Sequence, residues 1–369
     1  MLKKDFWYDL PKELIAQEPA DPRDAARLMV LDRKNDKILH SVFHELPHYL
    51  EKGDLLVVNN SKVLPARLMG TKVPTGAVCE LLLLRQVKGD TWECLARPGK
   101  RMQPGTKVEF GDGSLTAVVD ETLPDGNKYV TFTYDTETLY EKLDEFGKMP
   151  LPPYITKQLE DQSQYQTVYA MSEEHSAAAP TAGLHFTPEL IQRIKDKGCG
   201  WATVELEVGI DTFRLVEEDD PTEHVMHTER YHVPAEVVEA VHVTKAAGHR
   251  VIAVGTTAVR SLESAWDATA PAAATPVAAR GFEDRADAAG VCGMGDIVVR
   301  EDASTNLYLM PGSTYHVVDA LITNFHVPRS TLMMLVSALA TREQILDAYE
   351  QAVQERYRFF SFGDAMLIR

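Results

Sequence analysis

The chain has 369 residues, 44% of them hydrophobic and 25% charged, which is ordinary for a globular protein and long enough for two domains. Its longest apolar runs, such as TLMMLVSALA, have about half the length that a membrane-spanning helix needs, so the sequence argues against a membrane protein. The formal net charge of −17 argues against a protein that coats nucleic acid through general electrostatics, although a local basic patch remains compatible with it.

The N-terminal segment predicts short strands and turns without an export signal. MLKKDFWYDLPKEL has neither the apolar segment nor the cleavage site of a signal peptide, so we expect a cytoplasmic protein. Residues 27–43 contain two short apolar runs around Asn35 and Asp36, which predicts a hairpin. GDLLVVNN, residues 53–60, predicts a buried strand that ends in two asparagines.

Residues 66–147 differ in pattern from the segments on either side. They contain short β-rich runs, such as VCELLLLRQV and KYVTFTYD, separated at close spacing by Gly, Pro and Asp turns. This spacing is typical of a small antiparallel barrel. We therefore expect a discontinuous α/β domain of residues 1–65 and 148–369, with a β-barrel domain of residues 66–147 inserted into it.

The strongest local concentration of positive charge lies in ARPGKR, within the expected barrel. Arg97, Lys100 and Arg101 fall within five residues around a Pro-Gly turn. Such a cluster is usually a solvated turn, but it is also the best candidate for a local basic patch.

SAAAPTAGLHFTPEL places small residues and a histidine directly before a helix. Thr187 is an N-cap candidate and Pro188 suits the first helical position, so His185 stands at the helix entrance. Ala177–Ala179 and Gly183 would let a ligand or another strand approach the main chain, and the helix N-terminus offers N–H groups to an anion. The alternative is a tightly packed loop whose histidine is merely hydrogen-bonded.

Neither the cysteines nor the histidines predict a metal site. The four cysteines are far apart and form no CxxC pair, so we expect reduced thiols in the core and no disulfide framework. TEHVMHTERYH sets His224 and His227 three residues apart, but a zinc site needs a third or fourth ligand at coherent spacing. We expect no metal here, and either a polar rim that hydrogen-bonds a substrate or a structural network.

A helix, a buried strand and a second helix are predicted in chain order, as in an α/β sheet. Their segments are AEVVEAVHVTKAAG, RVIAVG and TTAVRSLESAW, and the second helix is opened by Thr256 or Thr257. Gly255 and the two threonines stand at the carboxyl edge of the strand, where open α/β sheets bind ligands, and Arg260 lies one turn further. A plain strand-to-helix turn is the alternative. Residues 265–306, rich in Ala, Pro and Asp and aperiodic, predict a flexible surface insertion.

DALITNFHVPRSTLMML predicts a buried strand that runs into Asn324 and His326, followed by a helix capped by Ser330. Polar residues or histidines thus precede helices at three places, near His185, Thr256 and Asn324. Their convergence favours an enzyme with a pocket at the ends of the strands.

Several segments, in one order from residue 13 to 368, together resemble the S-adenosylmethionine:tRNA ribosyltransferase-isomerases of queuosine biosynthesis. They include GDLLVVNNSKVLPARLMGTK, RPGKRMQPGTKVEFGDG, SAAAPTAGLHFTPELI, EHVMHTERY, RVIAVGTTAVRSLE and DALITNFHVPRSTLMMLVSALA. The resemblance implies an α/β sheet domain with an inserted β-barrel. It also implies transfer and isomerisation of the ribosyl part of S-adenosylmethionine onto 7-aminomethyl-7-deazaguanine at the tRNA wobble position. The expected products are epoxyqueuosine, adenine and methionine, so S-adenosylmethionine is a consumed co-substrate and no bound cofactor is expected.

The chemistry implied by the resemblance needs a base for an acidic C5′ hydrogen and a proton donor for adenine. We expect His185 in a proton-transfer role, because a helix N-terminus lowers the pKa of an imidazole, with His326 or His227 as alternatives. The expected substrate-binding residues are Thr181, Gly183, Thr256, Thr257, Arg260 and Asn324. Among these, the guanidinium of Arg260 suits the methionine carboxylate.

The resemblance also implies a tRNA partner. Arg67, Arg97, Lys100 and Arg101 are expected to form a basic face, partly on the barrel, that binds the anticodon stem-loop of tRNAs with a GUN anticodon. The target base has to leave its stack to reach the pocket. We expect a monomer or a weak homo-oligomer without membrane contact.

The chain departs from the family pattern at a few positions. In LEVGIDTF, Glu207 and Asp211 replace a histidine and a glycine, and His175 stands where glycine is usual. One alternative is therefore a member that binds S-adenosylmethionine or RNA without completing the transfer. A second, an S-adenosylmethionine methyltransferase, is disfavoured because no glycine-rich loop follows a first strand.

Overall fold

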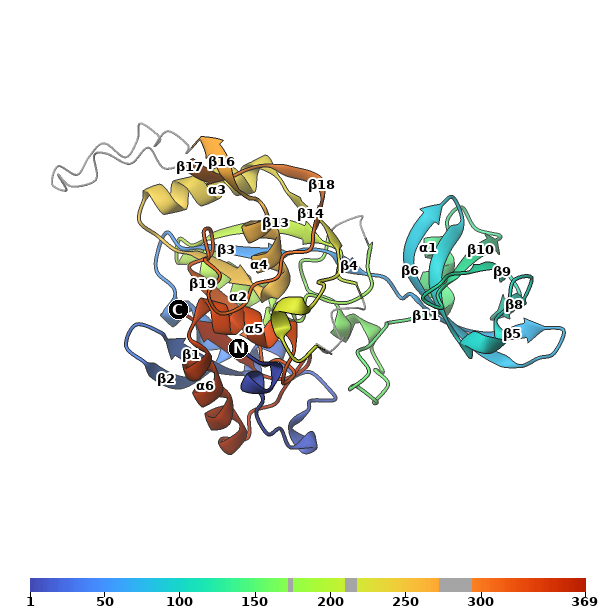
Figure 1. Ribbon diagram of the computed structural model, residues 1–369, viewed down its shortest axis with the longest axis horizontal. Coiled ribbons are helices and arrows are strands. Elements are labelled where there is room, and N and C mark those ends of the chain that lie inside the picture. Colours follow the sequence, from blue (N-terminus) through green and yellow to red (C-terminus); the bar gives the residue numbers. More distant parts are fainter. Residues whose placement is uncertain (172–174, 210–217, 272–293) are drawn as a thin grey trace.

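A mixed nine-stranded sheet forms the centre of the larger part of the molecule (Figure 1). The computed structural model describes residues 1–171, 175–209, 218–271 and 294–369. In sheet order the strands are β18 (Arg300–Thr305), β14 (Glu229–Val233), β13 (Gly200–Leu206), β3 (Leu55–Asn59), β15 (Val251–Val254), β19 (Ala320–Asn324), β20 (Ala365–Ile368), β1 (Arg27–Asp32) and β2 (Lys37–Val42). Strands β13, β3, β15 and β19 run parallel, and β20 lies antiparallel to β19 and parallel to β1. The predicted β1–β2 hairpin and the predicted buried strand β3 are confirmed.

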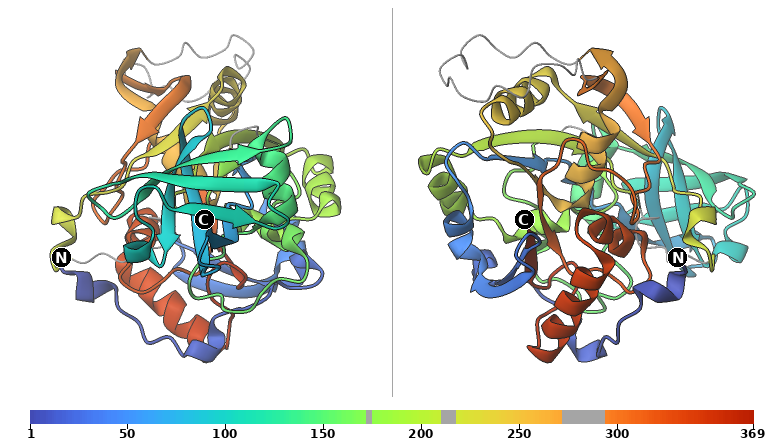
Figure 2. Two further views of the ribbon diagram at one scale, coloured as in Figure 1. Left: turned by 90° about the vertical axis from the view of Figure 1, so that its right-hand side faces the viewer. Right: turned by 60° about the vertical axis from the view of Figure 1, so that its left-hand side comes forward.

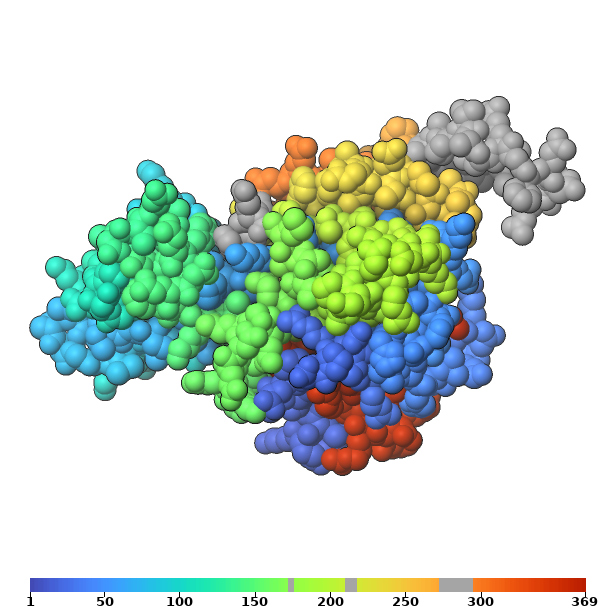
Figure 3. Space-filling model, turned by 180° about the vertical axis from the view of Figure 1, so that it is seen from behind, coloured from blue at the N-terminus to red at the C-terminus, as the bar shows by residue number. Residues whose placement is uncertain are grey.

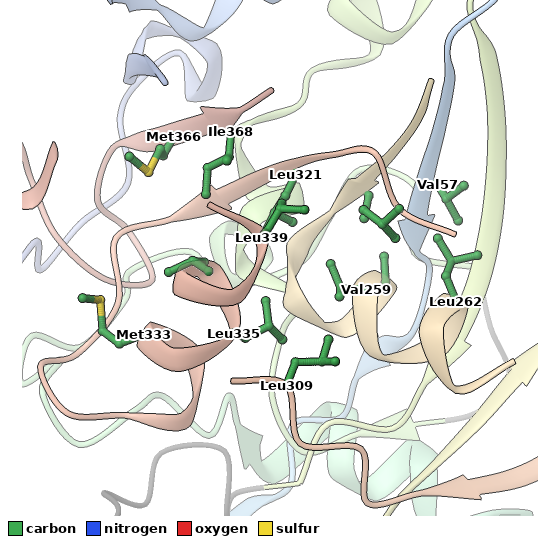
Figure 4. Close-up of a cluster of buried hydrophobic side chains, with 14 of the residues drawn as sticks. Val57, Val259, Leu262, Leu309, Leu321, Met333, Leu335, Leu339, Met366 and Ile368 are labelled. Atoms are coloured by element: carbon green, nitrogen blue, oxygen red, sulfur yellow. The ribbon is translucent and has the colours of Figure 1, made fainter. Parts of the chain in front are cut away.

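Helices cover both faces of this sheet (Figure 2). They are α2 (Pro188–Asp196), α3 (Ala235–Ala246), α4 (Gly255–Ser264), α5 (Thr331–Leu339), α6 (Arg342–Gln354) and the 3-10 helix η4 (Phe43–Tyr49). Val57 of β3 joins the hydrophobic cluster of α3 to α6, whereas its neighbour Val58 joins the cluster of α2 and η4, because side chains alternate along a strand. Figure 4 shows part of the first cluster, with Val57 and Leu321 of the sheet among residues of α4 and α5. Burial on both faces accounts for the continuous apolar runs of the central strands.

A second sheet forms a small antiparallel barrel. Its residues form a separate lobe of the molecule in Figure 3. Its strands, in sheet order, are β11 (Gly147–Lys148), β5 (Arg67–Val73), β6 (Val78–Lys88), β7 (Thr91–Arg97), β10 (Lys128–Tyr134), β9 (Leu115–Thr122) and β8 (Lys107–Phe110). Because β8 also pairs with β5, six strands close on themselves and, with helix α1 (Leu139–Phe146), enclose a separate core. The predicted α/β fold with an inserted antiparallel barrel is confirmed, while the limits of the inserted domain, residues 66 and 147, stay a prediction.

The segment 265–306, expected to be a flexible insertion, contains strands at both of its described ends. β16 (Trp266–Pro271) pairs with β17 (Met294–Ile297), and β18 adds to the edge of the large sheet. The expectation was wrong for these ends, because strand pairing and the stacking of Trp266 on His316, with ring centroids 4.6 Å apart, order them. Residues 272–293 lie outside the described residues.

Two helix starts bear on the site. The predicted N-cap of α2 is confirmed, since the Thr187 hydroxyl accepts a hydrogen bond from the backbone N–H of Leu190. Helix α4 begins at Gly255 and is not opened by Thr256 or Thr257, and no side chain caps it. Gly255 has a φ of +86°, which favours glycine and makes the sharp turn out of β15.

Candidate active site

A cavity of about 310 Å³ lies at the carboxyl ends of the parallel strands β15 and β19. Its walls come from the β15–α4 turn, the β19–α5 loop and the small residues that lead into the 3-10 helix η7 (Thr181–His185). The polar residues along it are Tyr154, Thr181, Thr256, Thr257, Thr323, Asn324, His326, Ser330 and Ser361. The remaining wall is largely apolar, from alanines, Val208 and Phe360. A mostly apolar recess with a few convergent polar groups at this edge of a sheet is typical of a ligand site.

Three of these residues, Tyr154, Phe360 and Ser361, were missed by the sequence reasoning. Tyr154 and Phe360 form an aromatic wall, with ring centroids 4.8 Å apart, and the Tyr154 hydroxyl lies 2.8 Å from that of Ser361. The three residues belong to the segments MPLPPYI and RFFSFGD, whose proline and aromatic residues were the available signals in the sequence.

Asn324 and Thr257, two polar residues of the cavity wall, differ in their hydrogen bonds. The side-chain amide N–H of Asn324 donates to the carbonyl oxygen of Phe360 at 2.9 Å, which ties the end of β19 to residue 360. The Thr257 hydroxyl oxygen is buried and has no hydrogen-bond partner among the residues that the structure describes. Since buried polar atoms are normally paired, Thr257 is well suited to meet a ligand, as is the Asn324 Oδ1, which is also buried without a hydrogen-bond partner among the described residues.

His326 lines the cavity and is fixed on several sides. Its Nε2 lies 2.9 Å from the Thr323 hydroxyl, its backbone N–H donates to the Tyr349 hydroxyl at 2.9 Å, and its carbonyl oxygen accepts from the Tyr8 hydroxyl. Burial lowers the pKa of His326 to about 3, so the imidazole is neutral at pH 7.

His185 lies in η7 next to the cavity residues but does not line the cavity. It is buried, with its ring 5.0 Å from that of Phe43. Burial lowers its pKa to about 4, and the positive charge of Arg358 adds to this effect while Asn324 opposes it. The lowered pKa of His185 therefore comes first from desolvation, and a contribution of the helix N-terminus stays a prediction.

Lowering the pH from 7 to 5 is expected to destabilise the protein through His185 and His326. Their folded-state pKa values, about 4 and about 3, lie below the value near 6.5 of an exposed imidazole. The unfolded chain therefore binds more protons in this window, and the free energy of unfolding falls as the pH falls. Each histidine contributes about 2 kcal/mol to the decrease.

Urea unfolding at pH 7 and pH 5 measures this effect. In a His185→Asn variant, the free energy of unfolding should decrease less between pH 7 and pH 5, by the contribution of His185. His48→Asn, at a side chain that is 72% exposed, serves as the control. An unchanged pH dependence in His185→Asn would contradict the prediction.

Gly183, expected to bind substrate, faces away from the cavity. A Cβ at this position would stand 1.9 Å from the Tyr169 hydroxyl and 2.9 Å from Cγ2 of Thr167. Gly183 is therefore required by close packing, and the expectation that it makes room for a ligand was wrong. Ala178 and Ala179, in contrast, do line the cavity.

Replacing Gly183 with alanine is expected to lower the free energy of unfolding by about 1–3 kcal/mol, because the new methyl group overpacks this contact. Tyr169→Phe removes the nearest clashing atom and should restore part of the loss. The Tyr169 hydroxyl makes no hydrogen bond to any described residue, so Tyr169→Phe alone should change the free energy of unfolding little. Chemical denaturation of the single and double variants measures the coupling, and additive effects would contradict the prediction.

Arg260 and His227 belong to a different cluster. The guanidinium of Arg260 pairs with Glu229, and both side chains are at most 5% exposed. His227 Nε2 lies 3.1 Å from Glu229 Oε1, and the Glu229 carboxylate also accepts from the backbone N–H of Gly209. Burial alone would raise the pKa of Glu229, but the contacts with His227 and Arg260 hold it below its ordinary value. Neither Arg260 nor His227 lines the cavity. Glu229 also neutralises the guanidinium of Arg260, which we expected to bind a carboxylate.

The expected basic residues lie on the barrel. Arg97, Lys100 and Arg101 are exposed around the end of β7, and Arg67 lies on β5 at 3.7 Å from Glu80. The strand register adds Lys148 of β11 directly opposite Arg67, which sequence reasoning missed.

The positions that depart from the family pattern are placed only in part. Glu207 lies 3.5 Å from Arg230 and outside the cavity wall. The backbone of His175 pairs with Lys62 in the short sheet of β4 (Lys62–Val63) and β12 (His175–Ser176). Asp211 lies outside the described residues.

Within the part of the chain that the structure describes, no three metal-ligating side chains gather in one place. Cys79, Cys94 and Cys199 are buried and free, and Cys292 lies outside the described residues. None of the helices in the described ranges has both the length and the apolar character needed to cross a membrane.

Comparisons with known proteins agree along the whole chain. Residues 3–368 match the family described as queuosine biosynthesis protein. The chain is 49% identical to the S-adenosylmethionine:tRNA ribosyltransferase-isomerase of Desulfitobacterium hafniense and 48% identical to that of Acetivibrio thermocellus, in each case over 100% of both chains. It is also similar to the crystal structure of S-adenosylmethionine tRNA ribosyltransferase from Thermotoga maritima, with 39% identity, a TM-score of 0.51, and coverage of 99% of this chain and 100% of that one.

Proposed function

Because this chain belongs to the queuosine biosynthesis family of S-adenosylmethionine:tRNA ribosyltransferase-isomerases, it is a transferase, and we propose which groups it joins. The proposed reaction moves and isomerises the ribosyl moiety of S-adenosylmethionine onto 7-aminomethyl-7-deazaguanine at the wobble position of tRNA. Epoxyqueuosine forms, and adenine and methionine leave.

The observation that carries this proposal is the cavity at the ends of β15 and β19. Its largely apolar walls suit a purine and a ribose, and the hydroxyls and amide along it suit their polar edges. Thr181, Thr256, Thr257 and Asn324 are the proposed binding residues. Arg260 is not included, because its charge is already paired with Glu229.

We assign the proton transfer to His326. The sulfonium of the substrate acidifies its C5′ hydrogens, so removal of one gives an ylide, and departing adenine then takes up a proton. His326 lines the cavity and its pKa of about 3 keeps the imidazole in the base form at neutral pH. His185, behind the wall, is proposed to position Asn324.

The Thr257 hydroxyl provides a clean test of ligand binding. Thr257→Val is expected to leave the free protein as stable as before, since the hydroxyl has no partner in it, but to weaken S-adenosylmethionine binding about tenfold. Thr167→Val is the matched control, because the Thr167 hydroxyl is also buried and unpartnered but does not line the cavity. Calorimetric titration and thermal melts compare the two variants, and equal affinities would remove Thr257 from the binding site.

The tRNA partner is proposed to contact the barrel. Arg67, Arg97, Lys100, Arg101 and Lys148 supply positive charge there, on a protein whose net charge is −17. Such binding confines contacts to the anticodon stem-loop, here proposed for GUN anticodons, and weakens as salt increases.

Adenine release tests the proposed function. The protein is incubated with S-adenosylmethionine, with and without tRNA carrying 7-aminomethyl-7-deazaguanine, and products are separated by chromatography. Adenine and methionine formed together, only with that tRNA, are expected. Ligand binding without adenine would indicate a binding protein, and S-adenosylhomocysteine with a methylated RNA would indicate a methyltransferase.

A further inference from the structure

The N-terminal segment runs along the loop that carries His326. The backbone N–H of Arg329 donates to the carbonyl oxygen of Phe6 at 3.1 Å, and the Tyr8 hydroxyl donates to the carbonyl oxygen of His326. Phe6 and Tyr8 are buried, whereas Trp7 between them is 51% exposed. The segment therefore anchors itself through Phe6 and Tyr8 and presents Trp7 at the surface.

Arg329 covers the exposed ring of Trp7. Its guanidinium carbon lies 4.4 Å from the ring centroid, which is a cation–π contact. None of the ion pairs among the described residues involves Arg329, although the chain carries 55 acidic residues against 38 basic ones. Within the described ranges, Arg329 is thus a positive charge without an acidic partner, on a protein of net negative charge.

The backbone of Arg329 is held in a conformation that its side chain disfavours. Its φ is +61°, in the left-handed region that a non-glycine residue other than Asn or Asp rarely adopts. Val327 and Ser330 of the same loop line the cavity, so Arg329 belongs to a loop that borders the site. Strained backbone of this kind is concentrated at functional sites.

We propose that Trp7 and Arg329 form a stacking platform for a tRNA nucleotide next to the modified base, with Arg329 also contacting its phosphate. This inference rests on the proposed function, in which the target base leaves its stack and exposes the faces of its neighbours. Unstacked RNA bases stack on aromatic rings and guanidinium planes, and the positive charge of Arg329 complements a phosphate. The platform is separate from the basic residues of the barrel.

The first test uses two asparagine variants at left-handed positions. Arg329→Asn relieves the backbone at residue 329, so its melting temperature should stay equal or rise, while tRNA affinity falls about tenfold. In a plot of log tRNA affinity against log salt concentration, the slope of Arg329→Asn should be less steep by about 0.7, which is the contribution of one phosphate contact. Arg356→Asn is the matched control, because Arg356 has a φ of +53°, a side chain that is 67% exposed and no part in the cavity wall.

Filter binding of tRNA carrying 7-aminomethyl-7-deazaguanine over a range of salt, with calorimetry of S-adenosylmethionine as a reference, measures both variants. Trp7→Ala should weaken tRNA binding about tenfold and leave S-adenosylmethionine affinity unchanged. Equal tRNA affinities of Arg329→Asn, Arg356→Asn and the unaltered protein would overturn the platform. If the unaltered protein modifies that tRNA while this result holds, the platform alone fails; absence of any tRNA binding contradicts the proposed function as well.

Discussion

Replacing His326 with glutamine is expected to slow adenine release about 100-fold or more while the protein stays folded. Glutamine keeps a polar group near the Thr323 hydroxyl and leaves the backbone contacts with Tyr349 and Tyr8 in place. It removes the imidazole, which has the one proton-accepting ring nitrogen among the described residues that line the cavity. Single-turnover chromatography of adenine measures the rate.

The affinity for S-adenosylmethionine separates a chemical role of His326 from a structural one. Calorimetry should give an affinity within about threefold of that of the unaltered protein, since less than about 0.7 kcal/mol of binding is then lost. His185→Asn provides the comparison: if it abolishes adenine release while His326→Gln leaves it intact, the assignment of proton transfer to His326 is wrong.

Replacing Arg260 with alanine is expected to lower the free energy of unfolding by about 3–5 kcal/mol, because the buried Glu229 carboxylate loses its guanidinium partner and keeps only its contacts with His227 and the Gly209 N–H. Urea denaturation at pH 7 measures the loss. In the double variant Arg260→Met, Glu229→Leu, both charges are absent and much of the stability should return.

This prediction distinguishes two roles for Arg260. If Arg260→Ala has the stability of the unaltered protein but binds S-adenosylmethionine poorly, then the guanidinium serves the substrate after all. A strong loss of stability that the double variant repairs would establish Arg260 as a structural group.

Much of the fold is predictable because its determinants are local in sequence. The alternating runs of residues 66–147, the continuous apolar run of β3 and the cap at Thr187 each depend on neighbours a few residues away. The same holds for the site at Thr256 and Asn324, because the carboxyl ends of parallel strands meet at one edge.

The errors at the candidate site involve partners that are distant in sequence. Gly183 looked like a place for a ligand because nothing in its own segment shows Tyr169 packed against it. Arg260 looked free because its partner Glu229 belongs to a strand on another part of the sheet. Phe360 lines the cavity and lies just before β20 in the chain. The pairing of β20 with β19 cannot be inferred from either segment alone.

The position of β20 has a consequence for how the protein is made. Residues 365–368 lie between β19 and β1, so the hairpin of β1 and β2 joins the rest of the sheet only through them. A ribosome synthesises this hairpin early, yet its sheet partner emerges after β19, α5 and α6. During translation the apolar residues of β1, such as Val30, therefore lack their final neighbours until the C-terminus has been synthesised. Chaperones that shield nascent chains would have to cover this hairpin for that time.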